Sequence, residues 1–491
     1  MAIPKVLGTE TEFGILIRGA ETFNPSLASA LVVNSVGDGR GQFSWSYDSE
    51  QPRTDARSGT HIEAFQPDYE AAAVNTVLSN GARFYVDHAH PEYSSPETID
   101  PRQAALYDVA GEEVCRIAMT AAQRLLGDGE VLALYKNNSD GKGNSYGYHE
   151  NVLLSRALPF GRIVEAMPTF LVSRQVISGS GKVGTEAGHP DTDFQLTQRA
   201  DFFEEVVGLE TTLRRPLVNT RDEPHADHRY RRLHVIHGDA TRSEVQTWVK
   251  LGALSLFLGA LEDDAIPDDL TLADPVAAGR AVSRDLSFSK GLRLTDGRSM
   301  TALDLQWLYP EWCSAWAQRQ DLEWSLALLD EWADLLTGIA QGPEVVADRL
   351  DWAAKHRLLS RAVARGASWD DPRIKTMDVQ YHDLRPEKGL YRRLVDRGAM
   401  RRLFDDDEVR RAAHEPPEDT RAYFRGRCVE RFGADLIAAN WDGLIFDDHR
   451  GQYKRVPMLD PLRGTKAHVA DLLDDVEDVE GLLDALQGGG E

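Results

Sequence analysis

The chain has 491 residues, 42% hydrophobic and 8% aromatic, which is typical of a soluble globular protein with one large domain and a smaller one. No run approaches the roughly 20 apolar residues that cross a bilayer, and the N-terminus lacks the layout of a signal peptide. The net charge of −24 argues against general nucleic-acid binding. The three widely spaced cysteines are expected to be reduced. We therefore expect a cytoplasmic protein with no membrane or nucleic-acid partner.

Segments with strand and helix periodicity alternate along the chain. Strands are predicted at 3–18, bent near Gly14, and at 82–87, 131–137, 146–155, 170–178 and 230–237. Helices are predicted at 103–126, 244–261 and 321–339, and an acidic amphipathic helix at about 465–487. Two prolines and a charge run in HEPPEDTR, at 414–421, predict a boundary between a large domain, 1–415, and a small C-terminal domain, 416–491.

Residues 36–70 are rich in glycine, serine, aspartate and proline and have no sustained period. A stretch of that length without regular structure is usually functional or disordered. It leaves the strand with Glu10 and Glu12 and returns before the strand with Asp87, so both of its ends are expected near one site. We therefore predict a mobile loop that folds over that site as a gate, with a disordered surface loop as the alternative.

Four of the predicted strands place charged or metal-binding side chains at every second position. These residues are Glu10 and Glu12, then Arg83, Tyr85 and Asp87, then His149 and Asn151, and finally Arg232 and His234. Alternate residues of a strand share a face, so the side chains would line one face of a sheet whose other face is buried under helices. A solvated face would explain any single strand, but burying so many ionisable groups requires a cation or a charged ligand. The pattern therefore favours an enzyme.

The residue types indicate which ligand to expect. Hard oxygen ligands suited to magnesium are offered by Glu10, Glu12 and Glu92. His149 and His234 can complete such a site or orient phosphates. Arg83 and Arg232 can pair with phosphate oxygens through their forked donors. The segment GSGKVG at 179–184 lacks the spacing of a Walker loop, and no Ser or Thr follows its Gly-Lys, so we interpret it as a turn or a mobile loop. Phosphate binding would then depend on metals and arginines.

Two stretches are rich in basic residues despite the acidic total. The first holds Arg214, Arg215, Arg221, Arg229, Arg231 and Arg232, and the second holds Arg385, Lys388, Arg392, Arg393, Arg397, Arg401 and Arg402. Each is either solvated surface with local acidic partners or a groove that captures phosphates or an acidic protein.

Five segments together carry a family resemblance. GTETEFG at 8–14, NGARFYVDHAHPEYSSPE at 80–97, YGYHEN at 146–151, RRLHVIHGD at 231–239 and NWDGLIF at 440–446 resemble the Pup ligase and deamidase family. That family acts on the prokaryotic ubiquitin-like protein Pup and is related to glutamine synthetase and glutamate–cysteine ligase. The resemblance implies an α+β fold. In it, a glutamine-synthetase-like large domain packs helices against a curved antiparallel sheet that cradles ATP and magnesium, and a small C-terminal domain follows.

The family has two branches. The ligase joins the C-terminal glutamate of Pup to a substrate lysine, whereas the deamidase, also a depupylase, converts the C-terminal glutamine of Pup to glutamate and cleaves the Pup–lysine isopeptide bond. The insertion at 36–70 and the segment HAHPEYSSPE at 88–97 resemble the deamidase branch. They imply a hydrolase that acts on Pup and pupylated proteins, with ATP and Mg²⁺ as cofactors and a functional link to the bacterial proteasome. The alternatives are a Pup ligase, a small-molecule carboxylate–amine ligase and an inactive Pup-binding module.

The resemblance also assigns roles to individual residues. Asp87 matches the catalytic aspartate; an amide carbonyl needs a nucleophile or a base that activates water, and both roles stay open. Metal-binding positions are matched by Glu10, Tyr85, Glu92, His149 and His234, with Glu12 as ligand or brace. Nucleotide-contacting positions are matched by Arg83, Ser95, Asn151 and Trp441, beside Arg232 on the same face. Trp441 would pack on the base, although Tyr85 and Trp441 can also be plain core aromatics.

Overall fold

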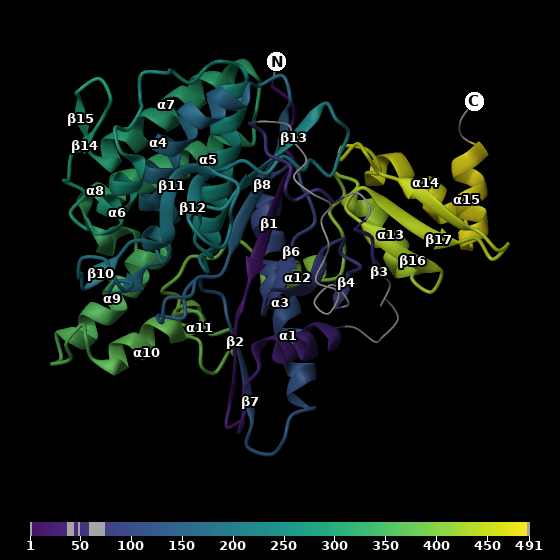
Figure 1. Ribbon diagram of the computed structural model, residues 1–491, viewed down its shortest axis with the longest axis horizontal. Coiled ribbons are helices and arrows are strands. Elements are labelled where there is room, and N and C mark those ends of the chain that lie inside the picture. The colour runs from purple at the N-terminus through teal and green to yellow at the C-terminus, as the bar shows by residue number, and fades with distance from the viewer. Residues whose placement is uncertain (1, 37–43, 48–49, 58–73, 489–491) are drawn as a thin grey trace.

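The computed structural model describes residues 2–36, 44–47, 50–57 and 74–488 (Figure 1). Its centre is a six-stranded sheet in the order β13-β8-β1-β6-β5-β4, and every neighbouring pair is antiparallel. The strands are β1 (Leu7–Glu12), β4 (Asn75–Val77), β5 (Arg83–Asp87), β6 (His90–Ser94), β8 (Tyr148–Ser155) and β13 (Tyr230–Val235). The four strands predicted to carry polar rows all belong to this sheet.

One face of the sheet is covered by helices. Phe84 and Val86 of β5 belong to a buried cluster with α3 (Pro101–Gln123). Leu233 and Val235 of β13 join a second cluster with α4 (Phe160–Ser178) and α5 (Glu244–Glu262). Because side chains alternate along a strand, the polar residues between these apolar ones face the opposite side. The expected arrangement of a helix-covered face and a polar face is confirmed.

Further helices extend this layer on one side of the sheet, where Figure 1 shows α4 to α9 gathered together. They are α6 (Pro275–Ser283), α7 (Ala302–Arg319), α8 (Ser325–Gln341), α9 (Asp351–Val363), α10 (Pro372–Tyr381), α11 (Leu390–Asp396) and α12 (Asp406–Ala412), with α1 (Pro25–Asn34) nearer the start of the chain. The short strands pair as β2 (Gly14–Arg18) with β7 (Val131–Tyr135), β9 (Lys182–Val183) with β10 (Phe194–Gln195), β11 (Phe203–Gly208) with β12 (Arg215–Asn219), and β14 (Leu292–Arg293) with β15 (Ser299–Met300). The predicted bend near Gly14 is therefore the passage from β1 to β2.

Two expectations about secondary structure outside residues 36–70 are wrong. The apolar run at 170–178 is not a strand but the last part of α4, and every residue in it is buried. A short apolar run buried on all sides carries no period that separates strand from helix. The helix expected at 465–487 is divided into α14 (Lys466–Asp475) and α15 (Val479–Gly488).

The C-terminal part has its own small sheet and core. Strands β16 (Leu436–Asn440), β17 (Gly443–Asp447) and β18 (Tyr453–Pro457) follow α13 (Ala422–Phe432), and β3 (Ser44–Trp45) pairs with β16 in parallel. The core of this part includes Trp45 and Val77 as well as residues beyond 416. The expectation of no regular structure in 36–70 is therefore wrong at β3. Residues 37–43, 48–49 and 58–73 lie outside the described residues, so the mobile gate and the division at residue 415 stay predictions.

Two predictions from composition can be compared with the structure. None of the described helices is both long and apolar enough to cross a bilayer. Cys115, Cys313 and Cys428 are buried, and each is a free thiol, as predicted.

Candidate active site

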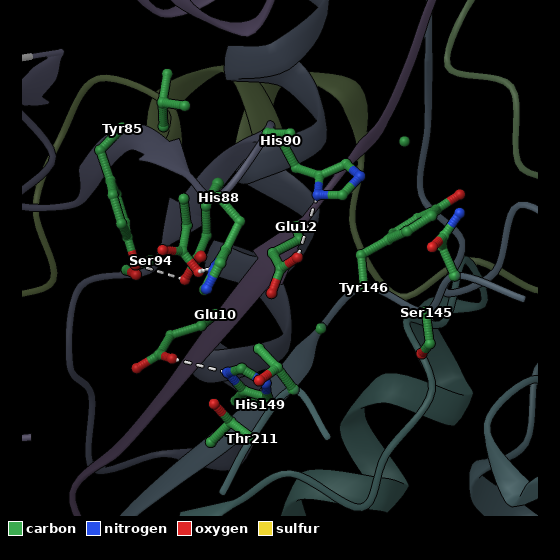
Figure 2. A pocket seen from close by; sticks show the side chains of 18 of the residues that line it. Glu10, Glu12, Tyr85, His88, His90, Ser94, Ser145, Tyr146, His149 and Thr211 are labelled. Carbon is green, nitrogen blue, oxygen red and sulfur yellow. Dashed lines mark hydrogen bonds and ion pairs between the residues drawn. The ribbon is translucent and has the colours of Figure 1, made fainter. Parts of the chain in front are cut away.

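The polar face of the central sheet forms one wall of a cavity of about 1420 Å³ (Figure 2). Ten predicted site residues line it: Glu10, Glu12, Arg83, Tyr85, Asp87, Glu92, His149, Arg232, His234 and Trp441. Ser95 and Asn151 line a smaller cavity of about 80 Å³, and Glu10, Arg232 and Trp441 line both. The structure therefore brings all twelve predicted residues together around two adjoining cavities.

Glu10, His149 and His234 form the first cluster of possible metal ligands, with one ligand atom from each within 4.8 Å of the others. Glu10 lies opposite His149 in the pairing of β1 with β8. Its Oε2 is 3.0 Å from His149 Nδ1, and its Oε1 accepts a hydrogen bond of 2.9 Å from the Asn151 amide. Burial opposes ionisation of Glu10, but the neighbouring histidines and Arg232 outweigh it and hold the pKa of Glu10 well below its usual range.

Arg232 and His234 reach the same cluster from β13. The Arg232 guanidinium donates to Asn151 Oδ1 over 2.7 Å and to the backbone carbonyl of Glu223 over 2.8 Å. His234 Nδ1 lies 2.9 Å from the same Asn151 oxygen. Burial lowers the pKa of His234 well below 6.5, so its imidazole is neutral and keeps a lone pair for a cation. Asn151 thus orients both residues.

Glu12, Asp87 and Glu92 form a second cluster, again with one carboxylate oxygen from each within 4.8 Å of the others. Glu92 lies opposite Glu12 on one side and Tyr85 on the other, and the Tyr85 hydroxyl donates to Glu92 over 2.6 Å. Burial, and then the charges of Asp87, Glu10 and Glu12, raise the pKa of Glu92 well above 4.5. A hard divalent cation would relieve this crowding, so the donor set fits the expected magnesium.

Gly147 lets these two clusters approach each other. A Cβ at this position would lie 2.6 Å from Glu12 Oε1 and 2.7 Å from His149 Nε2. Any larger side chain would push one of these ligands away. Lack of space beside Glu12 and His149 therefore explains why a glycine stands at this position of YGYHEN, which the sequence alone did not show.

Asp87 ends β5 immediately before a tight turn in which His88 has a φ of +53°. Its Oδ2 lies 2.8 Å from His88 Nδ1. Burial raises the pKa of Asp87, but the hydrogen bond and the charge of His88 outweigh burial and lower it; the same contact raises the pKa of His88 to about 9. Asp87 is therefore an ionised carboxylate that lines the cavity.

Arg83 is held between two aromatic rings. Its guanidinium lies 3.8 Å from the ring centroids of both Trp45 and Tyr85, and Nε donates to Asn75 Oδ1 over 2.8 Å. Tyr85 lines the cavity and binds Glu92, so it is more than a core aromatic. Trp441 lines both cavities while packing on the C-terminal core.

Ser95 and Asn151 line the smaller cavity. Ser95 Oγ accepts a hydrogen bond of 2.9 Å from the Thr9 backbone and donates to the Pro96 carbonyl over 3.2 Å. Trp441 also lines this cavity. Ser95 acts here chiefly by fixing the backbone at the end of β6.

Sequence reasoning missed several residues of the large cavity. His90 lies opposite Asp87 and two residues before Glu92 on β6, and its Nδ1 lies 3.4 Å from Glu12 Oε2, so its spacing from Glu92 could have identified it. Arg199 also lines the cavity, but it follows a loop with no periodic pattern. Tertiary structure alone brings it there.

The basic stretches divide between the two interpretations. In the second stretch, Arg392, Arg401 and Arg402 pair with Asp396, Glu331 and Glu244, as expected of local acidic partners, and Arg385 forms a buried pair with Asp383. In the first stretch, Arg214 and Arg229 pair with acidic residues, whereas Arg215, Arg221 and Arg232 line the large cavity. The first stretch therefore contributes to the groove of the large cavity.

Comparison with known proteins adds the family. A family model described as Pup-ligase protein matches residues 5–445. The chain is 47% identical over 504 residues to a depupylase of Acidothermus cellulolyticus, covering 99% of each chain. It is 46% identical to a Pup deamidase/depupylase of Mycolicibacterium smegmatis, covering 98% of this chain and 99% of the relative. Identity to a Pup–protein ligase of Kineococcus radiotolerans is 40%, covering 82% of this chain and 90% of that ligase.

Solved structures agree with this similarity. The complex between Pup and its ligase PafA matches with a TM-score of 0.80 and 29% identity, covering 99% of this chain and 95% of that chain. The Pup ligase PafA in complex with ADP matches with a TM-score of 0.74 and 32% identity, covering 84% and 96%. The α+β fold class is confirmed. The chain belongs to the Pup-ligase family, and within it resembles these depupylases more closely than this ligase.

Proposed function

We propose that this protein is a hydrolase that converts the C-terminal glutamine of Pup to glutamate and cleaves the isopeptide bond between Pup and a lysine of pupylated proteins. Relatives that match 98–99% of this chain at 46–47% identity are named for these activities. The observation that carries the proposal is Asp87, an ionised carboxylate that lines the cavity next to Glu12 and Glu92.

Asp87 would act on the carbonyl carbon of the scissile amide. As a nucleophile its carboxylate oxygen would form a mixed anhydride with the acyl group while ammonia or the lysine amine leaves, and water would then hydrolyse the anhydride. As a base it would take a proton from the attacking water. Both routes need the carboxylate ionised and free of a bidentate arginine. The described contacts of Asp87 meet this condition, because its carboxylate pairs with His88.

We infer that Mg²⁺ and an adenine nucleotide bind along β1. The fit rests on the donors: Glu10, His149 and His234 in one cluster, and Glu12 and Glu92, beside the catalytic Asp87, in the other. Ser95, Asn151 and Trp441 would hold the base end in the smaller cavity, and Arg83 and Arg232 would contact phosphates. When bound, Mg²⁺ would supply the positive charge that polarises the scissile carbonyl, and the nucleotide phosphates would help to hold the metal. Amide hydrolysis needs no net energy from ATP, so the nucleotide would act as a cofactor.

Pup would approach the cavity from the side of the first arginine-rich stretch, since Pup is expected to be acidic and Arg215 and Arg221 line that wall. The family resemblance further supports a cytoplasmic location and a functional link to the bacterial proteasome. We also retain the division into a large domain, 1–415, and a small C-terminal domain, 416–491, with the 36–70 insertion over the site.

Incubation with Pup ending in glutamine, ATP and Mg²⁺ tests the proposal. Mass spectrometry should detect conversion of the terminal amide to an acid, and a pupylated protein in the same buffer should release free Pup. A ligase would instead join Pup ending in glutamate to a lysine-containing protein. Conjugation without deamidation or release would overturn the proposal, as would turnover of ATP with free amino acids alone.

A further inference from the structure

One end of the large cavity has an apolar lining that the proposed chemistry does not use. Leu16 on β2, Phe23 before α1 and Val379 on α10 all line it, and their side chains are 37%, 40% and 38% exposed. None of these three described residues lines the smaller cavity, where Ser95 and Trp441 lie. Apolar side chains left open at the mouth of a charged cavity indicate a ligand with an apolar part.

The course of β1 and β2 shows where this lining lies relative to the reacting groups. β1 begins at Leu7 beside the smaller cavity and ends at Glu12 in the second cluster of possible ligands. β2 then carries the chain from Gly14 to Leu16. Two residues of an extended chain advance by about 7 Å. The wall therefore continues from Glu12 past Gly14 to Leu16, on the side away from the proposed nucleotide.

Tyr146 lies over Gly14, in the middle of this wall. A Cβ at Gly14 would be 2.6 Å from the Tyr146 hydroxyl, so the tyrosine packs directly against the strand. Its hydroxyl donates to Asn137 Oδ1 over 2.6 Å, and its ring packs on His90 with centroids 4.6 Å apart and planes at 32°. Figure 2 shows both rings on the same side of Glu12. Because the hydroxyl is bonded within the protein, Tyr146 offers the cavity chiefly its ring.

This aromatic part of the wall is next to the catalytic carboxylate. His90 lies opposite Asp87 in the pairing of β5 with β6. Tyr135 lies opposite Gly14 in the pairing of β2 with β7, and it lines the cavity as Tyr146 does. A group that extends from the scissile amide on this side would pass the aromatic rings before it reaches the mouth of the cavity.

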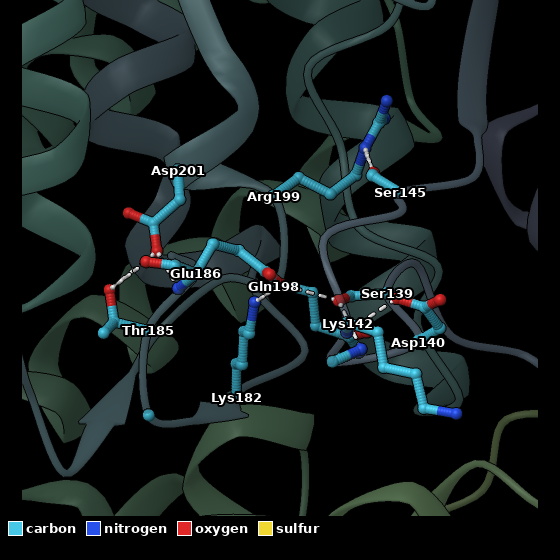
Figure 3. A network of polar contacts seen from close by, with 12 residues as sticks. Ser139, Asp140, Lys142, Ser145, Lys182, Thr185, Glu186, Gln198, Arg199 and Asp201 are labelled. Atoms are coloured by element: carbon cyan, nitrogen blue, oxygen red, sulfur yellow. Dashed lines mark hydrogen bonds and ion pairs between the residues drawn. The ribbon is translucent and has the colours of Figure 1, made fainter. Parts of the chain in front are cut away.

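The loop before Tyr146 fixes the position of the wall. The Tyr146 N–H donates to the Asn138 carbonyl over 3.2 Å, and the Tyr146 carbonyl accepts from the Asn138 side-chain amide over 3.1 Å. The next residue, Ser139, donates to Glu186 over 2.8 Å, and Glu186 pairs with Lys182 (Figure 3). Lys182 belongs to GSGKVG, so this segment supports the wall, with its lysine bound to Glu186.

We propose that the wall from Tyr146 to Leu16 binds the lysyl side chain that leaves when the isopeptide bond of a pupylated protein is cleaved. This inference rests on the proposed function. The lysyl nitrogen of that bond carries no charge, and a stem of methylene groups joins it to the lysine Cα. Such stems commonly lie along apolar surface while their polar ends stay in water. Rings beside Asp87 and a leucine farther out therefore match the order of groups in the ligand.

Charge separates this ligand from Pup itself. Arg215 and Arg221 line another part of the cavity and suit an acidic chain, whereas the wall from Tyr146 to Leu16 presents rings and methyl groups. Both the Pup chain and the lysyl stem extend from the scissile amide, so they need separate walls. Deamidation releases ammonia, which has no stem. The wall should therefore favour depupylation and contribute little to deamidation.

The test compares substrates that differ only in the leaving group. One is Pup ending in glutamine, and the other is Pup whose terminal glutamate is joined through its side chain to the side-chain nitrogen of Nα-acetyl-lysine amide. A methylene in an apolar pocket is worth about tenfold or more, so on this open wall Leu16→Ser should lower the ratio of kcat/KM for the lysine-linked substrate to kcat/KM for deamidation by about three- to tenfold. With methylamine in place of the lysine, the ratio should not change.

Two variants serve as controls for this ratio. Leu16→Met keeps an apolar contact and should keep the parental ratio. Leu125→Ser is the same substitution as Leu16→Ser at a leucine that is 68% exposed in the turn after α3, outside the cavity lining, and it should also keep the ratio. Both substrates are measured with one preparation, so the ratio does not depend on the folded fraction of a variant.

Binding provides a readout without turnover. Calorimetry in an Asp87→Asn background should show that Leu16→Ser lowers the affinity for the lysine-linked substrate relative to Pup ending in glutamine. Equal losses for both substrates would assign this wall to Pup itself and overturn the inference, as would an unchanged ratio. Cleavage of a pupylated protein but not of the acetyl-lysine conjugate would also overturn it, by placing recognition on the protein surface. A parent that processes none of these substrates would instead contradict the proposed function.

Discussion

Trp45 and Trp441 meet edge to face, with ring centroids 5.5 Å apart and ring planes at 73°. Trp45 belongs to the short strand β3, inside the insertion, and Trp441 follows β16 near the other end of the chain. Trp45 also stacks on Arg83, and Trp441 lines both cavities. The insertion and the C-terminal part therefore build one wall of the site together.

We expect Trp45→Ala to weaken both the fold and nucleotide binding. The side chain is 5% exposed, so its removal should lower the free energy of unfolding by about 3–5 kcal/mol. A double-mutant cycle of Trp45→Ala and Trp441→Ala, measured by urea unfolding, should give an interaction free energy of about 0.5–1.5 kcal/mol for the ring pair. The control is Trp307→Ala, since Trp307 is 39% exposed on α7. Unchanged nucleotide affinity in folded Trp45→Ala protein would exclude this wall from the binding site.

Asp87→Asn should abolish deamidation and depupylation while leaving nucleotide binding largely intact. The amide cannot act as nucleophile or base, and loss of such a group costs at least about 10²-fold in rate. Rates are measured with Pup ending in glutamine and with a pupylated protein, and nucleotide affinity by calorimetry. Asp128→Asn, on an exposed turn, serves as the control. Near-parental rates in Asp87→Asn would remove the catalytic assignment.

Without divalent cations, the protein should lose stability as the pH rises above about 4.5. Burial and then Asp87, Glu10 and Glu12 raise the pKa of Glu92 well above 4.5, so in this range the folded state holds a proton that the unfolded state has released. Fewer protons bound in the unfolded state make the free energy of unfolding fall with pH. The pKa values of Glu10 and Asp87 are lowered, so these two groups change the stability of the protein only at pH values below this range.

Melting temperatures in EDTA from about pH 5 to about pH 8 check this slope. Glu92→Gln should flatten it, because an amide carries no charge at any pH, whereas the exposed control Glu21→Gln should not. Mg²⁺ should raise the melting temperature of the parent most at high pH, where the cation replaces the proton. An equal slope in the parent and Glu92→Gln would show that another group titrates.

Glu97→Gln should detach the C-terminal part from the central sheet. Glu97 pairs with Arg421 at 2.7 Å and with Arg425, which stacks on Trp441 with 4.9 Å to the ring centroid. Removing one partner of a buried ion group costs about 3–5 kcal/mol. The control is Glu430→Gln, since the exposed Arg427–Glu430 pair on α13 should contribute less than about 1 kcal/mol.

Acid provides an independent check of the same contact. Burial opposes ionisation of Glu97, but the two arginines outweigh it and lower its pKa to about 2. Its stabilisation is therefore present above the ordinary value of 4.5 and is lost as the pH falls toward 2. Glu97→Gln should be less sensitive to acid over that range, and equal acid sensitivity would contradict the assigned role.

The sequence predicted the polar face well because the period of a strand fixes which residues share it. Glu10, Asp87, His149 and His234 could be placed on one face before their strand order was known. Strand β6 was missed, because the turn at His88 joins it to β5 with almost no loop. The α4 run was misread, because burial on all sides removes the period.

Other parts of the site depend on contacts between distant segments. Arg199 and Arg215 both donate to Ser145, one to its hydroxyl and the other to its carbonyl oxygen, and no spacing along the chain indicates this shared partner. Similarly, β3 pairs with β16 although a glycine- and serine-rich composition is typical of loops. Local sequence patterns therefore predicted the sheet, whereas the walls of the cavity depend on long-range packing that these patterns do not indicate.

Glu10 and Glu12 are two residues apart on β1, so the repeat of the extended backbone holds their ligand clusters about 7 Å apart. No loop or rotamer sets that interval. A slip of β1 by one residue would present Thr9 and Thr11 in their place and remove both carboxylates at once. Partly registered strands would therefore have no partial activity, and during refolding catalysis should recover in a single phase with the pairing of β1 to β6 and β8.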